Sequence, residues 1–100
     1  MECDTQVGVT NNQPFYKCNT DGYWCSEDYQ GNTFNFQGCA DQCSANNFAA
    51  FTFSLSNPQS GTGYCSCTTS SGATFISTSG NYNAYAIGTP LDPPAGPSCT

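Results

Sequence analysis

Cysteine is the residue type with the most evident chemistry in this chain of 100 residues. The eight cysteines are Cys3, Cys18, Cys25, Cys39, Cys43, Cys65, Cys67 and Cys99. The C-x3-C and C-x-C spacings among them have the ligands for a four-thiolate zinc site. However, the other four cysteines also need partners, and an even number at this density is typical of a disulfide framework. We therefore predict that all eight form disulfides, and that the chain holds no metal and no cofactor.

The other side chains offer little catalytic chemistry. The sequence has no histidine, which excludes the serine–histidine and cysteine–histidine pairs of nucleophilic catalysis. Two of its seven carboxylates could form the acid pair of a glycosidase. Such an enzyme also needs a deep cleft, which a short disulfide-rich chain rarely supplies. We therefore predict that the protein is not an enzyme.

Charged residues are few and mostly negative. Seven Asp and Glu residues face Lys17 alone, so the formal net charge is −6. Nucleic acids and anionic membranes both bind basic surfaces, so neither is an expected partner. No apolar run approaches the roughly 20 residues that a membrane-spanning helix needs. We therefore expect no membrane insertion.

Aromatic residues are the remaining functional signal. The chain has seven Phe, six Tyr and one Trp. Most of the phenylalanines fall at inward positions of predicted strands, whereas four other rings gather in the first third of the chain: Tyr16, Tyr23, Trp24 and Tyr29. Exposed Tyr and Trp rings serve both sugar stacking and protein recognition. We take these four as candidate binding residues; half-buried tyrosines that close a small core are the alternative.

The pattern of apolar residues predicts one helix among several strands. Two aromatic stretches flank an Asp-Gly turn signal and predict a hairpin over residues 15–25. Cys39 and Cys43 are four residues apart, on one face of a helix predicted over residues 38–47. Short apolar or alternating runs predict strands at 33–36, 49–55, 64–68, 73–77 and 82–87. The expected fold is α+β, with one short helix packed on an antiparallel sheet of about four to six strands and stabilised by disulfides.

The length of the chain corresponds to a single disulfide-rich domain, residues 1–100. Residues 1–32 form an N-terminal segment with the hairpin, and residues 33–88 form the helix-plus-sheet core. Residues 89–100 contain four prolines and are predicted to be an extended tail. The uncharged strand predicted at 82–87 is a candidate sheet edge, which makes a homodimer one option.

Geometry suggests how the cysteines pair. Four residues along a helix and two along a strand both span roughly 6–7 Å, from rises of about 1.5 and 3.3 Å per residue. Two adjacent bridges can therefore join the helix to the 64–68 strand. The other pairs would close the hairpin and tie the chain ends together. Many connectivities stay open; the predicted pairs are Cys3–Cys99, Cys18–Cys25, Cys39–Cys67 and Cys43–Cys65.

Three short motifs in the middle of the chain resemble a known family pattern. They are the C-x3-C of residues 38–43, the F-x-F of residues 48–53 and the C-x-C of residues 64–67. Their order resembles the centre of PAN/apple modules and of the WSC modules of fungal cell-surface proteins, over residues 33–87 at most. The resemblance implies binding to a glycan or a protein, and it carries no catalytic residue.

The whole chain resembles the small secreted cysteine-rich proteins of plant-associated fungi. Disulfides persist in oxidising surroundings, so we expect a secreted, extracellular protein. The resemblance implies a fungal effector or host-interaction protein whose partner is an extracellular protein or a cell-wall glycan. A carbohydrate-binding module that uses Trp24 and the nearby tyrosines is the alternative function. A structural coat protein is a third possibility.

Overall fold

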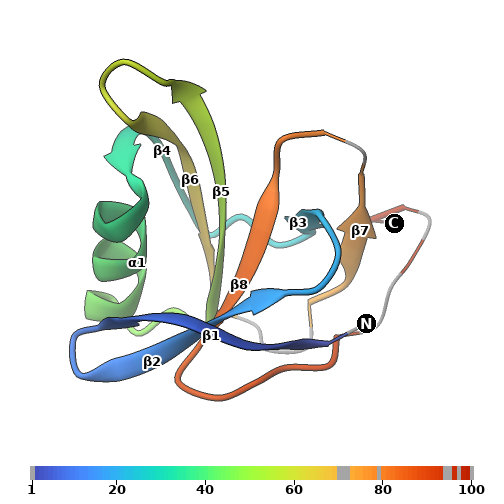
Figure 1. The fold of residues 1–100 in the computed structure, drawn as a ribbon. Helices are drawn as coiled ribbons and strands as arrows, with labels where there is room; N and C mark the ends of the chain where they lie inside the picture. Colours follow the sequence, from blue (N-terminus) through green and yellow to red (C-terminus); the bar gives the residue numbers. More distant parts are fainter. Residues whose placement is uncertain (1, 70–72, 79, 94–95, 97, 100) are drawn as a thin grey trace.

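The chain folds into one helix and two antiparallel sheets in the computed structural model, which describes residues 2–69, 73–78, 80–93, 96 and 98–99 (Figure 1). The strands are β1 Cys3–Thr10, β2 Gln13–Cys18, β3 Gly22–Trp24, β4 Tyr29–Asn35, β5 Ala50–Asn57, β6 Thr62–Thr68, β7 Phe75–Ser77 and β8 Asn83–Ile87, and the helix is α1 Phe36–Ala45. Six strands form one sheet in the order β1-β2-β8-β5-β6-β4, and β3 pairs with β7. The predicted α+β fold, with a helix packed on a disulfide-stabilised sheet, is confirmed.

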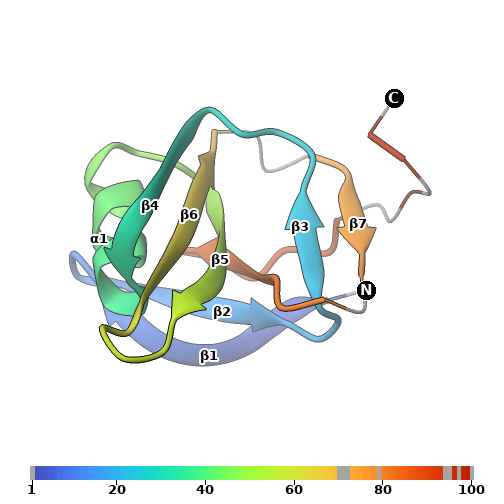
Figure 2. The same ribbon diagram turned by 90° about the horizontal axis from the view of Figure 1, so that it is seen from above.

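The large sheet is curled, and α1 lies across the gap between its two edge strands, β1 and β4 (Figure 2). The small β3–β7 sheet packs on the other face of the large sheet, over β5 and β8. The sheet therefore has an inner face toward α1 and an outer face toward β3. Because β1 and β2 belong to this sheet, the core extends beyond the predicted 33–88 segment.

Residue size divides the two faces of the sheet. Along β5, Phe51 and Phe53 point to the inner face, while the smaller Ala50 and Thr52 point to the outer face. Alternation of this kind follows from the two-residue period of a strand. The small outer residues leave room for Trp24 of β3, which is 2% exposed and donates a hydrogen bond from Nε1 to the carbonyl oxygen of Phe51 at 3.2 Å.

All eight cysteines form disulfides, as predicted, and two adjacent bridges join α1 to β6. The predicted partners within those two bridges are wrong. A tight turn connects α1 to β5, so α1 runs back along β5, and β6 is antiparallel to β5. α1 and β6 therefore run in the same direction, so the first cysteine of the helix lies beside the first cysteine of the strand, and the second beside the second. The observed bridges are Cys39–Cys65 and Cys43–Cys67, in place of Cys39–Cys67 and Cys43–Cys65.

The predicted hairpin over residues 15–25 is wrong, because the N-terminal hairpin joins β1 to β2 instead. Asn11 and Asn12 form its turn with positive φ angles of 47° and 66°. Such angles suit a tight hairpin, and asparagine tolerates them better than most residues. Residues 3–10 are therefore a strand, and Cys3 lies opposite Cys18 in the register.

Both remaining predicted disulfides are consequently wrong. Cys3 bonds to Cys18 across the β1–β2 hairpin, rather than to Cys99. The C-terminal tail contacts β1 at Leu91 rather than at Cys99. Leu91 and Cys3 exchange two backbone hydrogen bonds of 2.7 and 3.2 Å. The chain end then reaches Cys25, which bonds to Cys99 instead of Cys18.

The predicted helix is shifted by two residues, from 38–47 to Phe36–Ala45. Asn35 caps its first turn, because its side chain accepts a hydrogen bond from the backbone N–H of Gly38 at 2.6 Å. The strand predicted at 33–36 is accordingly longer and earlier, as β4 ends at Asn35. Phe36 packs on the inner core from the helix rather than from a strand.

The strand predicted as an edge for self-association, at 82–87, lies inside the sheet. It corresponds to β8, which pairs with β2 on one side and β5 on the other. Its backbone is therefore not available for pairing with a second copy, and the edges of the large sheet are β1 and β4. Homodimerisation stays a prediction without this edge to support it.

Polar contacts attach α1 to β1. Thr10 at the end of β1 is 1% exposed, and its hydroxyl donates to Asp41 Oδ1 at 2.7 Å and lies 2.8 Å from Ser44 Oγ. Gln37 donates from Nε2 to the backbone oxygen of Val9 at 3.0 Å. The helix thus covers the end of an edge strand with hydrogen bonds rather than with apolar packing.

We predict that Thr10→Val destabilises the protein by about 1–2 kcal/mol, because the isosteric change removes a buried hydrogen bond to a carboxylate. Denaturant unfolding with the disulfides intact measures the change. Thr5→Val is the control, because Thr5 is an exposed threonine of the same strand. Equal effects of the two substitutions would show that the Thr10 contacts do not hold the helix.

The disulfides should differ in their resistance to reduction. Cys99 is exposed and Cys25 half-buried, whereas the other six cysteines are at most 1% exposed. A reducing thiolate must reach a sulfur atom, so we expect mild reduction followed by alkylation to label Cys25 and Cys99 first. Peptide mapping under non-reducing conditions reads out both the pairing and the order. Early labelling of Cys39 or Cys43 would contradict the structure.

Candidate functional site

Three tyrosines from separate parts of the chain meet between the two sheets. Tyr23 comes from β3, Tyr64 from β6 and Tyr82 from the segment before β8. The ring of Tyr82 is edge-to-face with both of the others, at centroid distances of 5.9 Å to Tyr23 and 6.4 Å to Tyr64. With Glu27 they line a cavity of about 270 Å³. We call this group of four residues the tyrosine cleft.

The disulfides determine which way Tyr64 points. Cys65 and Cys67 face α1 on the inner side of β6, so the residue before them must face the outer side. Tyr23 is placed in the same way by Trp24, because neighbouring strand residues point to opposite faces and Trp24 is buried against the large sheet. The backbone oxygen of Tyr82 accepts a hydrogen bond from the N–H of Gly22 on β3 at 2.9 Å. The residue is 39% exposed, so its ring is the one of the three most available to a ligand.

Hydrogen bonds fix the ring of Tyr64. Its hydroxyl donates to Glu27 Oε1 at 2.9 Å, and Gln30 Oε1 lies 3.1 Å from the same hydroxyl. Burial, the hydrogen bond to the Glu27 carboxylate and the negative charge of Glu27 together raise the pKa of Tyr64 from 10.0 to about 12. The tyrosine therefore stays neutral at physiological pH and holds Glu27 at the rim of the cleft.

The neighbouring carboxylate, Asp28, has a structural role. It accepts hydrogen bonds from the backbone N–H of Thr69 at 2.9 Å, from Thr69 Oγ1 at 3.0 Å and from Ser26 Oγ at 3.0 Å. The bond from the Thr69 backbone is the main cause that lowers the pKa of Asp28. These bonds attach the segment that carries Glu27 to the end of β6.

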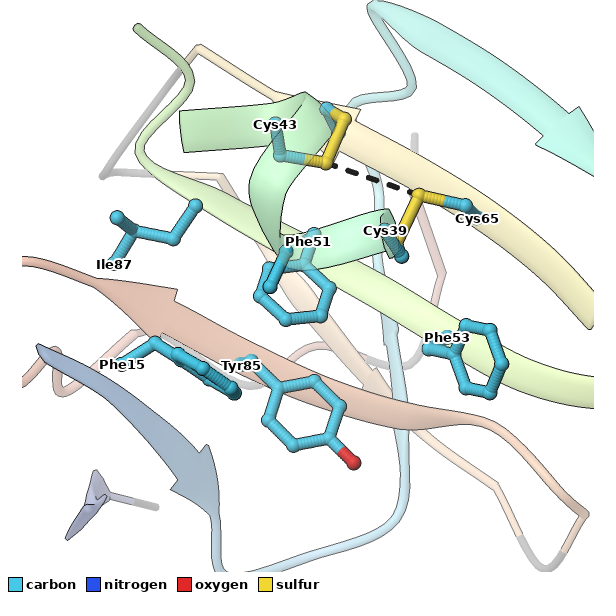
Figure 3. Packing of buried hydrophobic residues seen from close by; sticks show 10 residues of the cluster. Phe15, Cys39, Cys43, Phe51, Phe53, Cys65, Tyr85 and Ile87 are labelled. Carbon is cyan, nitrogen blue, oxygen red and sulfur yellow. Dashed lines mark hydrogen bonds between the residues drawn. A yellow bond between two sulfur atoms is a disulfide. The ribbon is translucent and has the colours of Figure 1, made fainter. Parts of the chain in front are cut away.

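A second, larger cavity of about 580 Å³ lies at one end of the curled sheet, where β5 extends beyond its pairing with β8. Its lining includes three rings and three polar side chains: Phe36, Phe53, Tyr85, Asp21, Asn81 and Asn83. We call it the mouth cavity. Figure 3 shows Phe53 and Tyr85 at the edge of the inner core, with the hydroxyl of Tyr85 directed away from the other labelled rings.

The four predicted binding residues do not form one site. The prediction that Trp24 is a binding residue is wrong. Its ring is buried against Phe75, and its Nε1–H already donates a hydrogen bond to the carbonyl oxygen of Phe51. Tyr23 is part of the tyrosine cleft, but Tyr16 packs on the outer core and Tyr29 contacts Phe34 on β4. The two short aromatic stretches predicted a hairpin. In the structure the large sheet buries β3 instead, and the local sequence does not indicate this burial.

Tyr64 and Tyr82 were missed as site residues, although the sequence held a signal for one of them. A residue next to an inward C-x-C pair must face outward, which places Tyr64 opposite the helix. Tyr82 gives no comparable signal, because it lies in a turn whose position depends on tertiary packing.

No helix in the described part of the chain is long and apolar enough to cross a membrane.

No known family model, curated protein or solved structure gives a significant match to this chain. The resemblance to PAN/apple and WSC modules therefore stays a prediction. The candidate site is defined by its own geometry: a cleft of tyrosines next to a larger aromatic cavity.

We predict that Glu27→Gln lowers the pKa of Tyr64 from about 12 while leaving it above 10, because the negative charge is lost and the burial remains. A pH titration that follows the ring resonances by NMR measures the change. Tyr85 is the internal control, since burial and Asp21, rather than Glu27, raise its pKa to about 12. An unchanged Tyr64 titration would show that Glu27 does not contact its hydroxyl in solution.

Proposed function

We propose that this chain is a secreted, non-enzymatic protein that binds another protein outside the cell through the tyrosine cleft. The observation that carries the proposal is the meeting of Tyr23, Tyr64 and Tyr82 at one cleft, with Tyr82 39% exposed. Tyrosine is enriched at the centres of protein interfaces, because its ring is apolar and rigid while its hydroxyl can bond to a partner.

Charge indicates which partner surfaces suit the cleft. Its charged residue is Glu27, and the whole chain has a net charge of −6. An acidic partner surface would be repelled, whereas a neutral or basic one would be attracted and would associate faster. We therefore propose an extracellular protein partner with a neutral or basic binding surface.

Two features of the chain support secretion and a non-enzymatic role. Four disulfides are consistent with an oxidising, extracellular environment. The chain lacks histidine, and every cysteine is in a disulfide, so neither supplies a nucleophile or its base. A fungal effector that binds a host protein fits these properties and the resemblance to small secreted fungal proteins.

A carbohydrate-binding function that depends on Trp24 is not retained. Such a function needs an open row of aromatic faces, and the indole of Trp24 is 2% exposed. An aromatic row through Tyr16 and Tyr29 is also absent among the described residues, since these two rings pack on different parts of the sheet. The protein-binding proposal depends on neither Trp24 nor these two tyrosines.

We predict that Tyr82→Ala weakens partner binding roughly 30-fold, the effect of losing about 2 kcal/mol at an interface hot spot. Immobilised wild-type protein and variants are incubated with extracellular fluid from plant leaves. Proteins retained by the wild type are identified by mass spectrometry, and their affinities for each variant are then measured. Tyr29→Ala is the matched control, because Tyr29 is exposed and lies outside the cleft.

The expected result is a protein that is retained by the wild type and by Tyr29→Ala but lost with Tyr82→Ala. Thermal unfolding of each variant verifies that the fold is kept. Retention of the same proteins by the wild type and Tyr82→Ala would contradict a role for the cleft. Failure of the wild type to retain any protein would contradict the proposed class of partner.

A further inference from the structure

The mouth cavity has the shape and lining of a ligand site that is separate from the tyrosine cleft. Its volume of about 580 Å³ falls within the roughly 300–1,000 Å³ typical of small-molecule pockets. An apolar floor and a polar rim line it, which is the composition expected of a site that both buries and orients a ligand. We propose that the mouth cavity binds a neutral saccharide.

The floor of the cavity consists of adjoining aromatic rings. Phe36, at the start of α1, is 5.7 Å from Phe53 of β5 and 5.0 Å from Tyr85 of β8, measured between ring centroids. Leu55 extends this apolar surface and is 47% exposed. A pyranose ring has an apolar face of C–H groups, which packs on aromatic carbons. The floor therefore suits one face of a sugar.

The rim carries hydrogen-bonding groups whose capacity the protein does not use. Asn81 and Asn83 each offer an amide donor and acceptor, and Asp21 offers a carboxylate. Among the described residues, none hydrogen-bonds to the side chains of Asn81 or Asn83. Paired amide and carboxylate groups match the hydroxyl groups at the edge of a sugar ring. An aliphatic ligand would leave these groups unmatched.

Tyr85 adds a hydroxyl to the hydrogen-bonding groups of the cavity. The residue is only 6% exposed, and none of the described residues hydrogen-bonds to its hydroxyl. No buried side-chain nitrogen or oxygen among the described residues lacks a partner, so this hydroxyl is the part of Tyr85 that solvent reaches. The residue lines the cavity, and its hydroxyl points away from the core rings (Figure 3). A ligand hydroxyl in the cavity would take the place of water at this group.

Charge restricts the sugar to a neutral one. Asp21 lies at the rim, its partner Lys17 is 3.9 Å away, and the chain has a net charge of −6. A uronic or sulfated sugar would bring a second negative charge close to Asp21 and would be repelled. The negative charge of Asp21 also reaches Tyr85 on the floor of the cavity. After burial, it is the second cause that raises the pKa of Tyr85.

The test is an NMR titration of the labelled protein with three neutral trisaccharides: cellotriose, laminaritriose and triacetylchitotriose. Trigalacturonate is the anionic comparison. We expect saturable shifts in the amides of residues 80–85 with at least one neutral sugar below about 10 mM, which covers weak binding in the mM range. Trigalacturonate should bind at least about 10-fold more weakly because of the repulsion by Asp21.

Two matched variants remove a single hydroxyl each. Tyr85→Phe should weaken binding of the sugar about 3- to 10-fold, the usual effect of losing one hydrogen bond. It should keep the fold, because none of the described residues hydrogen-bonds to that hydroxyl. Tyr29→Phe, on β4 and outside the cavity, should bind like the wild type. Asn83→Ala should weaken binding as well.

Three results would overturn the proposal: no saturable shift with any neutral trisaccharide, tighter binding of trigalacturonate, or equal binding by Tyr85→Phe and Tyr29→Phe. The proposal does not rest on the protein-binding function. Loss of a protein partner with Tyr82→Ala tests the tyrosine cleft, and loss of sugar with Tyr85→Phe tests the mouth cavity. Either proposal can therefore fail while the other holds.

Discussion

The double attachment of α1 to β6 is the constraint on which the rest of the structure depends. Cys39–Cys65 and Cys43–Cys67 hold successive turns of the helix against alternate residues of the strand. A single bridge would leave the helix free to rotate, but two adjacent bridges determine its direction as well as its position. A helix of ten residues is marginal by itself in water, so the covalent links supply the order that its few apolar residues do not.

A fixed helix has consequences for both faces of the sheet. On the inner face, α1 spans the gap between β1 and β4 and encloses the aromatic core, and the mouth cavity lies beside Phe36, where the helix begins. On the outer face, the same C-x-C spacing that turns the cysteines inward turns Tyr64 outward, into the tyrosine cleft. The disulfides are therefore not a separate stabilising feature. They position the surfaces that are available for binding.

The sequence was informative where a short pattern determines the geometry. The spacings C-x3-C and C-x-C predicted a helix linked twice to a strand, and alternation along residues 49–55 predicted β5 with its phenylalanines inward. It was uninformative where tertiary packing decides. The direction of α1 relative to β6, and with it the correct pairs, depends on the order of the strands. The burial of Trp24 depends on the docking of β3 on Ala50 and Thr52, which no local pattern reveals.

Amide hydrogen exchange of the native protein, followed residue by residue with NMR, tests most directly whether the disulfides fix α1 to the sheet. If they do, the amides of α1 should exchange as slowly as those of β5 and β6, because helix and sheet can open only together. The small β3–β7 sheet should be less protected, since it is not bonded to the large sheet along a strand. Fast exchange throughout α1, while β5 and β6 stay protected, would contradict the account.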